Sequence, residues 1–161
     1  MITLIPIEQS DFETFLEHEI VEYAQDKVKS GNWLAEEALE KSRAEYLGML
    51  PDGLQTQDQF IFTIFDEQTR QKLGVLWVQV KLGAARRRAF ICDFVIEPQS
   101  RGQGFGKQAL QALDKKLLEM GVESISLHVF AHNTQAIGLY EKMGYAVTNL
   151  YMGKKLSGSS D

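Results

Sequence analysis

The first third of the chain has apolar residues at three- and four-residue steps, which is the spacing of one face of an α-helix. This pattern predicts a helix over residues 8–30, which ends at Gly31, and a second helix over 35–50, which ends before a turn at 51–53. A short strand near Thr3–Ile5 precedes both helices. The apolar positions of the first helix are Phe12, Phe15, Leu16, Ile20, Tyr23, Ala24 and Val28.

The middle of the chain is rich in β-branched and aromatic residues, which favour strands. Two predicted strands, 60–65 and 73–81, flank a polar stretch at 66–72 and therefore form a predicted hairpin. After a turn at 82–88, a third strand covers 89–96. Strands joined by such short connections are expected to pair antiparallel.

The second half of the chain alternates helices with strands. A glycine-rich loop at 101–106 opens a helix that Gly121 ends, a strand covers 124–130, a helix covers 133–143, and a last strand covers 145–152. The apolar positions of the first of these helices are Ala109, Leu110, Leu113, Leu117, Leu118 and Met120. The predicted fold class is therefore α/β, with a mixed and mostly antiparallel sheet flanked by helices.

Length and composition favour one globular domain. The chain has 161 residues, of which 44% are apolar and 24% charged, enough to bury a sizeable core. We assign residues 1–156 to the domain and 157–161 to a flexible tail. The net charge of -5 argues against nucleic acid as a partner, because such proteins usually show a basic excess. Neither a membrane-length apolar run nor a signal peptide is visible, so we expect no membrane partner and a cytoplasmic location.

The chain offers little for metal or disulfide chemistry. Cys92 is the single cysteine, which excludes an internal disulfide and a cysteine-rich metal site. His18, His128 and His132 lack the spacing of metal ligands, so no metal is predicted.

The strongest chemical signal is the loop at 98–107, between a predicted strand and a predicted helix. Its three glycines keep side chains away from the backbone, and the start of the helix offers unpaired N–H groups, so the loop suits a phosphate. A nucleoside-triphosphate loop needs Ser or Thr where Gln108 stands, and a dinucleotide loop needs glycine where Lys107 stands. The pattern that fits is R-x-x-G-x-G, with Arg101, Gly104 and Gly106.

This loop resembles the pyrophosphate loop of the GNAT superfamily of acetyl-CoA-dependent N-acetyltransferases. A second motif of that family, V-x-x-x-N-x-x-A-x-x-L-Y-x-x-x-G-F/Y, follows after one helix and one strand. Its matching residues are Val129, Asn133, Ala136, Leu139, Tyr140, Gly144 and Tyr145. The resemblance is specific over 90–145 and agrees in element order over 3–152. It implies a sheet that splays between its fourth and fifth strands.

The resemblance also implies where acetyl-CoA binds. The pantetheine arm would pair with the exposed backbone of Phe94, Val95 and Ile96, and Asn133 and Tyr140 would contact the cofactor. Asn133 also fits the ordinary role of a helix N-cap, and both roles can hold at once. The pyrophosphate would lie on Arg101, Gly102, Gln103, Gly104, Phe105, Gly106 and Lys107.

Direct attack of an amine on the thioester requires a group that takes the proton of the amine. Asp93 is the first candidate, because a carboxylate among the apolar residues of its strand is costly unless it has a partner or a role in a site. His128 and a water molecule are the alternatives. Tyr140 occupies the family's tyrosine position and would assist the departing thiolate, although a core aromatic is its simpler interpretation. A covalent role for Cys92 is disfavoured, since no base is placed beside it.

The acceptor remains open. It is a small-molecule amine or a peptide amine that enters beside the first two helices, where Tyr23, Trp33 and Trp77 could line the entrance. The acidic residues Glu19, Glu22, Asp26, Glu36 and Glu37 would favour a cationic acceptor or simply form a solvated helix face. A non-catalytic acyl-CoA-binding regulatory domain is the alternative function, and a homodimer is compatible with the sequence. A tRNA-modifying enzyme would need a basic surface that this chain lacks.

Overall fold

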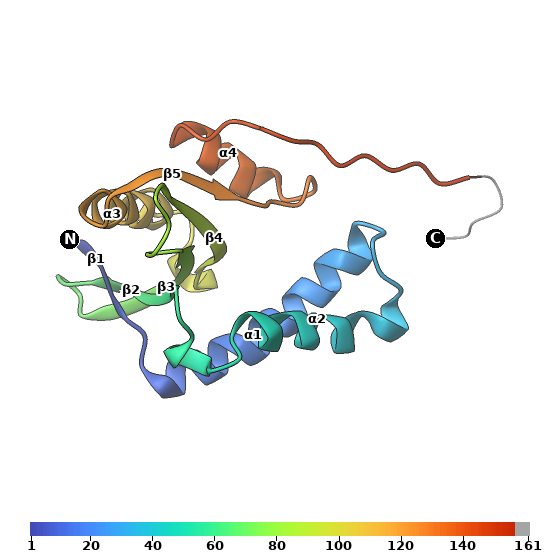
Figure 1. Ribbon diagram of the computed structural model, residues 1–161, viewed down its shortest axis with the longest axis horizontal. Helices are drawn as coiled ribbons and strands as arrows, with labels where there is room; N and C mark the ends of the chain where they lie inside the picture. The colour runs from blue at the N-terminus through green and yellow to red at the C-terminus, as the bar shows by residue number, and fades with distance from the viewer. Residues whose placement is uncertain (157–161) are drawn as a thin grey trace.

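The structure, a computed structural model, describes residues 1–156 (Figure 1). Its elements, in chain order, are β1 (Ile2–Pro6), α1 (Gln9–Lys29), α2 (Ala35–Met49), β2 (Gln59–Asp66), β3 (Gln71–Val80), β4 (Arg87–Ile96), α3 (Phe105–Glu119), β5 (Val122–Leu127) and α4 (Thr134–Lys142). None of the helices in the described part of the chain is long and apolar enough to cross a membrane. The flexible tail predicted for 157–161 lies outside the described residues.

The five strands form one mixed sheet in the order β1-β2-β3-β4-β5. The first four strands pair antiparallel with their neighbours, whereas β4 and β5 are parallel. Parallel neighbours need a crossover connection, and α3 supplies it between β4 and β5. The predicted fold class, with its mixed and mostly antiparallel sheet, is confirmed.

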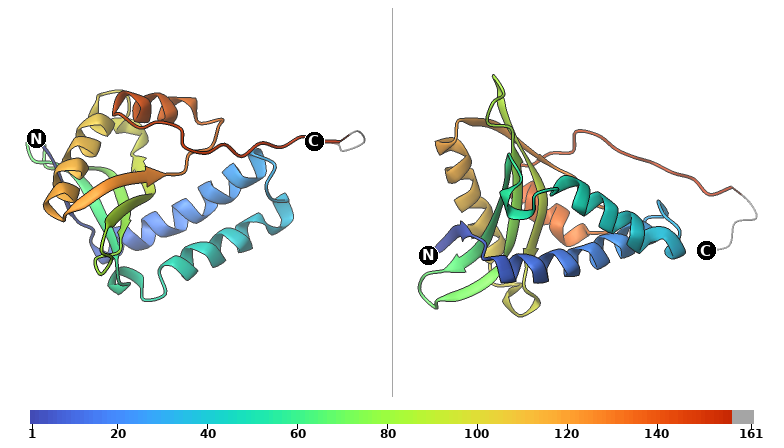
Figure 2. Two further views of the ribbon diagram at one scale, coloured as in Figure 1. Left: turned by 45° about the horizontal axis from the view of Figure 1, so that its top comes forward. Right: turned by 60° about the horizontal axis from the view of Figure 1, so that its bottom comes forward.

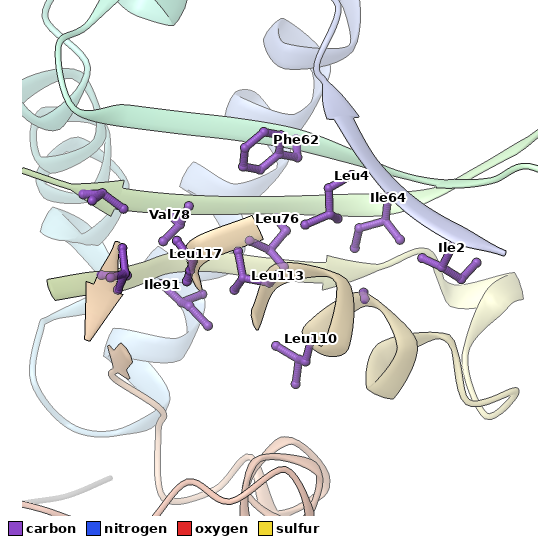
Figure 3. Packing of buried hydrophobic residues seen from close by; sticks show 14 of the residues in the cluster. Ile2, Leu4, Phe62, Ile64, Leu76, Val78, Ile91, Leu110, Leu113 and Leu117 are labelled. Atoms are coloured by element: carbon purple, nitrogen blue, oxygen red, sulfur yellow. The ribbon is translucent and has the colours of Figure 1, made fainter. Parts of the chain in front are cut away.

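Helices cover both faces of the sheet, so the chain has two hydrophobic clusters (Figure 2). On one face, Leu110, Leu113 and Leu117 of α3 pack against the strands, as Figure 3 shows from close by. On the other face, α1 and α2 pack through Phe12, Phe15, Ile20, Tyr46 and Leu50 onto Ile61 and Trp77. The amphipathic spacing seen in the sequence thus places α1 and α2 opposite α3.

The sheet splays between β4 and β5. Their pairing ends at Ile91 and Leu127, although β4 continues to Ile96, so the last five residues of β4 have no partner on the β5 side. The break coincides with a bulge: Trp77 pairs with Asp93 and Val78 with Ile91, which leaves Cys92 as the extra residue. Because a β-bulge bends its strand and increases the local twist, it accounts for the divergence of β4 from β5. The predicted splay is confirmed.

The C-terminal segment departs from the sequence prediction. The last strand expected over 145–152 is not formed, and the chain from Tyr145 to Leu156 has no regular secondary structure. Figures 1 and 2 show this segment leaving α4 and running away from the sheet. The prediction of a strand over 145–152 is therefore wrong: the residue types favour a strand, but a strand also needs a hydrogen-bonded neighbour, and residues 145–152 pair with no strand of the described chain.

The close approach of β3 and β4 yields the first prediction. A Cβ atom at Gly74 would overlap the carbonyl oxygen of Val95, and backbone cannot move aside as a flexible side chain does. We expect Gly74→Ala to lower the free energy of unfolding by at least about 2 kcal/mol, measured by urea denaturation.

Gly48→Ala is the matched control, because nothing lies within 4 Å of its Cβ position in α2. This control should be neutral or stabilising by up to about 1 kcal/mol, since alanine favours helix. Equal stability of Gly74→Ala and the wild type would contradict the account of the β3–β4 contact.

Candidate active site

A cavity of about 260 Å³ lies where β4 and β5 diverge. Its walls come from α1 and α2 on one side and from β4, the 127–133 segment and α4 on the other. Four residues expected from the sequence to act in catalysis or cofactor binding line it together, namely Asp93, Phe94, Asn133 and Tyr140. The splay therefore produces a cavity at the place that the sequence analysis assigned to the site.

Asp93 is held in place by two hydrogen bonds. The hydroxyl of Tyr46 donates to its Oδ2 over 3.0 Å, and the backbone N–H of Phe94 donates to its Oδ1 over 3.0 Å. Enclosure away from water raises the pKa of the Asp93 carboxyl well above its ordinary value, and the negative charge of Glu19 raises it further. Asp93 is thus a fixed carboxyl group whose proton affinity is greatly increased.

Glu19, from α1, is the partner of Asp93. Its side chain is buried, with 7% of the residue exposed, and it shares a hydrogen bond with the Asp93 carboxyl. Burial raises the pKa of Glu19 from 4.5 to about 7, and the hydrogen bond to Asp93 opposes part of that rise. Two carboxyl groups so close together do not both ionise readily, so each raises the proton affinity of the other.

Aromatic rings enclose the two carboxyl groups. The Tyr46 ring lies edge-on to Tyr23, with centroids 5.8 Å apart, and 5.9 Å from the ring of Trp77. Phe130 lies 6.1 Å from Tyr23 across the cavity. Burial and the Asp93 charge raise the pKa of the Tyr46 hydroxyl, which therefore stays protonated and remains a donor to Asp93. Trp33, expected at the entrance, packs edge-on against Tyr23 at 5.6 Å.

Tyr140 reaches the same cavity from α4. Its ring lies 6.4 Å from that of Phe94 on β4 and 5.5 Å from that of Tyr145. Burial, with smaller effects from Tyr145 and Asp93, raises the pKa of Tyr140 to about 12. Its hydroxyl is therefore neutral at physiological pH and available as a hydrogen-bond donor.

The glycine-rich loop lies beside this cavity and has the backbone of an anion cradle. Gly102 and Gly104 adopt φ values of 74° and 82°, a left-handed conformation that favours glycine, and nothing lies within 4 Å of a Cβ at either position. Gln108 is the first residue of α3 whose amide bonds backward, to Gly104. The amides of the three residues before it, Phe105 to Lys107, have no acceptor within the helix and can bind an anion.

The side chains of the loop have different surroundings. Arg101 donates from Nε to the carbonyl of Ile96 over 2.8 Å, and Gln103 donates to the carbonyl of Gln99 over 3.2 Å. Lys107 is exposed. A Cβ at Gly106 would lie 3.0 Å from Leu139, so this glycine lets α3 approach α4 closely. Gly106 is therefore needed for the packing of α3 against α4, which the motif alone did not indicate.

The remaining cofactor residues fit an extended ligand along β4. The backbone from Cys92 to Ile96 has no strand partner on the cavity side, while the side chains of Val95 and Ile96 pack into opposite clusters. The Asn133 side chain accepts a hydrogen bond from the Ala136 amide over 3.3 Å, as expected of an N-cap, and also lines the cavity. Free strand backbone, an adjacent anion cradle and an amide side chain together suit the pantetheine and pyrophosphate parts of coenzyme A.

The other chemical candidates have less favourable settings. His128 lines the cavity edge-on to Phe130 at 4.9 Å, and burial lowers its pKa, which weakens it as a proton acceptor. His132 pairs through Nε2 with Asp26 over 2.9 Å. Burial raises the pKa of the Cys92 thiol to about 12, which disfavours a thiolate nucleophile. No group of three potential metal ligands occurs within residues 1–156.

The acidic entrance is formed only in part. Glu19 and Asp26 line the cavity, joined by Glu45 of α2, which the sequence analysis did not select. Glu36 and Glu37 do not line it, and Glu37 instead accepts a hydrogen bond from Lys41 over 2.7 Å on the surface of α2.

Tyr46 is the residue that sequence reasoning missed. It is buried beside Asp93, yet a tyrosine on the apolar face of a helix gave no chemical signal. Glu19 did give one, since it occupies a core position of the helical repeat, four residues after Phe15 and four before Tyr23. A charged residue at such a position indicates a buried partner.

Comparisons with known proteins place these features in a family. Residues 30–145 match the Acetyltransferase (GNAT) family. The chain is 38% identical over 154 residues to the uncharacterized N-acetyltransferase YdgE of Bacillus subtilis, over 96% of this chain and 98% of that protein. The crystal structure of the putative acetyltransferase YycN from Bacillus subtilis superposes with a TM-score of 0.92 at 38% identity, covering 97% of this chain and 99% of that one. A shorter match, 33% identical over 87 residues, joins 53% of this chain to 26% of a mycothiol acetyltransferase from Renibacterium salmoninarum. The glycine loop and the Asn133–Tyr145 motif are thus features of a chain that belongs to the GNAT family of acetyltransferases.

Proposed function

We propose that this protein is an N-acetyltransferase that moves an acetyl group from acetyl-CoA to a primary amine by direct attack, without a covalent enzyme intermediate. The observation that carries this proposal is the meeting, in one cavity, of the Asp93–Glu19 carboxyl pair and the Tyr140 hydroxyl at the free edge of β4. Amide formation from an amine and a thioester requires a group that takes up the amine proton and a hydrogen-bond donor that stabilises the departing sulfur.

Acetyl-CoA would supply the acetyl thioester. The unpaired backbone of Phe94, Val95 and Ile96 would bind its extended arm, and the amides at the start of α3 would bind its pyrophosphate. The charge of Lys107 adds to this anion site in a chain that is acidic overall. Asn133 would contact the arm while it caps α4.

The Asp93–Glu19 pair would take the proton of the acceptor. A primary amine with a pKa of about 10.4 is almost entirely protonated at pH 7, so attack requires a base. A carboxyl pair with raised proton affinity, once one of its members is ionised, can both attract the ammonium form and accept its proton. Tyr46 keeps Asp93 in place during this exchange.

Tyr140 would assist the sulfur as the C–S bond breaks. A thiol with a pKa of about 8.5 is a stronger acid than Tyr140 at about 12, so full proton transfer to sulfur would be uphill by roughly 5 kcal/mol. We therefore assign Tyr140 the donation of a hydrogen bond that strengthens as negative charge develops on sulfur. The amine proton reaches the thiol through solvent.

The acceptor would be a small-molecule amine or a peptide amine, taken up in the cytoplasm. The cavity sets Glu19, Asp26 and Glu45 among the rings of Tyr23 and Tyr46, which suits a cationic amine with an apolar stem. No metal is assigned a role.

Substitution of Gly104 tests the cofactor site. Gly104→Val places a branched side chain in the open space above the loop and strains a left-handed backbone, so the affinity for acetyl-CoA should fall at least about tenfold in titration calorimetry. Gly31→Val is the matched control, because Gly31 has a φ of 79° and equally open surroundings at the end of α1. Unchanged affinity in folded Gly104→Val would refute the loop assignment.

The carboxyl pair predicts how stability depends on pH. The folded state raises the pKa of Glu19 from 4.5 to about 7, so it holds the proton more tightly than the unfolded chain between these values. The free energy of unfolding should therefore fall as the pH rises through this window, by up to roughly 3 kcal/mol from Glu19. Glu19→Gln removes the titration of Glu19 and should make the loss of stability between pH 5 and 8 smaller in urea denaturation, while the part due to Asp93, whose pKa burial also raises, remains.

Glu13→Gln, at an exposed position of the same helix, is the control and should keep the wild-type pH dependence. If Glu19→Gln lost stability with pH as steeply as the wild type, the raised pKa of Glu19 would be disproved.

An acceptor screen that follows free thiol release tests the function itself. With an accepted amine, Asp93→Asn should lower kcat/KM by about 10²- to 10⁴-fold, and Tyr140→Phe should lower kcat by about 10- to 1,000-fold with little change in acetyl-CoA binding. Tyr145→Phe, which removes a hydroxyl from the neighbouring ring, should retain wild-type activity. Binding of acetyl-CoA without turnover across polyamines, aminoglycosides and lysine peptides would instead favour a non-catalytic acyl-CoA-binding domain.

A further inference from the structure

His18 on α1 links the buried carboxyl pair to solvent. Its Nδ1 lies 3.0 Å from Oε1 of Glu19, which is hydrogen-bond distance. The side chain of His18 is 62% exposed, whereas that of Glu19 is 10% exposed and lines the cavity. Two adjacent residues of one helix therefore connect the wall of the cavity to bulk water.

The connection continues inward from Glu19. Glu19 shares a hydrogen bond with the Asp93 carboxyl, and Asp93 lines the same cavity as Tyr140. From the surface inward, the order is thus His18, Glu19 and Asp93, and each of these side chains can take up and release a proton. They form a series of hydrogen-bonded titratable groups that leads from solvent to the place where the acceptor amine would react.

Acetyl transfer needs such a path, because the reaction releases protons inside the cavity. An ammonium nitrogen loses two protons as it becomes an amide, and the thiol of coenzyme A takes up one, so one proton enters solvent in each turnover. The carboxylate that accepts protons must also be regenerated before the next acceptor reacts. When the acceptor and the arm of acetyl-CoA occupy the cavity, they displace its water, and Glu19 then offers a separate way out.

We propose that Asp93, Glu19 and His18 form a proton relay, in which protons from the acceptor amine pass through the carboxyl pair to the imidazole of His18 and from there to water. The relay rests on the proposed acetyl transfer and specifies how the proton-accepting carboxylate is regenerated. His18 acts through Glu19 and does not touch the substrate.

The relay moves a proton in three steps. The carboxyl pair takes up a proton from the ammonium nitrogen, and Glu19, at the outer end of the pair, gives a proton to Nδ1 of the neutral His18 ring. The resulting imidazolium releases a proton from Nε2 to water. The exposed ring then turns, or exchanges its remaining proton with water, until an unprotonated nitrogen faces Glu19 again. Each step breaks one N–H or O–H bond and forms another, so the protein is unchanged after a full cycle.

The proton affinities along the relay suit these steps. Burial raises the pKa of Glu19 to about 7, and histidine is the side chain whose charge ordinarily changes between about pH 5 and 8. A proton can therefore pass from this carboxyl group to an imidazole without a large cost in free energy. The charged groups that act on Glu19 come from three elements, namely Glu22 and Asp26 of α1, Asp93 of β4 and Arg101 of the glycine-rich loop.

Steady-state kinetics with an amine accepted in the screen above tests the relay. His18→Asn keeps an N–H donor beside Glu19 but cannot carry a proton. In dilute buffer at pH 7, kcat should fall at least about fivefold while kcat/KM for the acceptor changes little, because regeneration of the carboxylate follows the chemical step. Free imidazole at about 50 mM should restore most of the lost kcat, after subtraction of its enzyme-free reaction with acetyl-CoA.

Gln25→Ala is the matched control, because Gln25 is exposed on the same helix. This control should keep the wild-type kcat and its response to imidazole. His18→Ala replaces His18→Asn if circular dichroism shows that the latter is unfolded. A His18 variant with the wild-type kcat in dilute buffer would refute the relay. A loss of kcat that imidazole does not restore would also refute it, since that result indicates a structural role for His18.

Nuclear magnetic resonance tests the link between His18 and Glu19 without an acceptor. The ring ¹⁵N shifts of His18 should follow two titrations in the wild type, those of His18 and Glu19, and only one in Glu19→Gln. Identical titration curves in the two proteins would contradict the contact in solution and overturn the relay. A protein that has the contact but turns over no amine of the panel would instead overturn the proposed acetyl transfer, and the relay with it.

Discussion

One extra residue in β4 organises the site. The bulge at Cys92 ends the pairing of β4 with β5 at Ile91 and Leu127, and everything assigned to chemistry lies beyond that point. Without the bulge, β4 and β5 would continue to pair. The backbone N–H and C=O groups of β4 that are proposed to bind the cofactor would then be hydrogen-bonded to β5. A bulge also places two consecutive side chains toward one face. Cys92 packs with the α1–α2 cluster and Asp93 contacts Tyr46 and Glu19, which lie on that same side.

The bulge also explains why two carboxyl groups can share a buried position. Asp93 is presented from a rigid strand, and Glu19 from a helix whose neighbouring residues Phe15 and Ile20 fix it to the sheet. Burying one carboxylate is costly, and burying two is tolerable only when a proton and several donors neutralise them. The Tyr46 hydroxyl and the Phe94 amide provide those donors. The same buried contacts therefore affect both the stability of the fold and the proton affinity of the two carboxyl groups.

The sequence predicted those parts of the molecule that depend on local pattern. The helical spacing of α1 and α3, the hairpin and the end of α3 at Gly121 all follow from neighbouring residues, and the structure has them. The partnership of Glu19 with Asp93 and Tyr46 could not be predicted, because it joins three elements through tertiary packing. The bulge was equally hidden, since an extra residue in β4 is visible only against the register of β3.

The C-terminal segment marks the same limit from the opposite side. The residue types of 145–152 favour a strand, yet a strand is defined by a hydrogen-bonded neighbour, and within residues 1–156 this segment has none. Residue preference therefore indicates where a strand can form, and tertiary pairing decides whether it does.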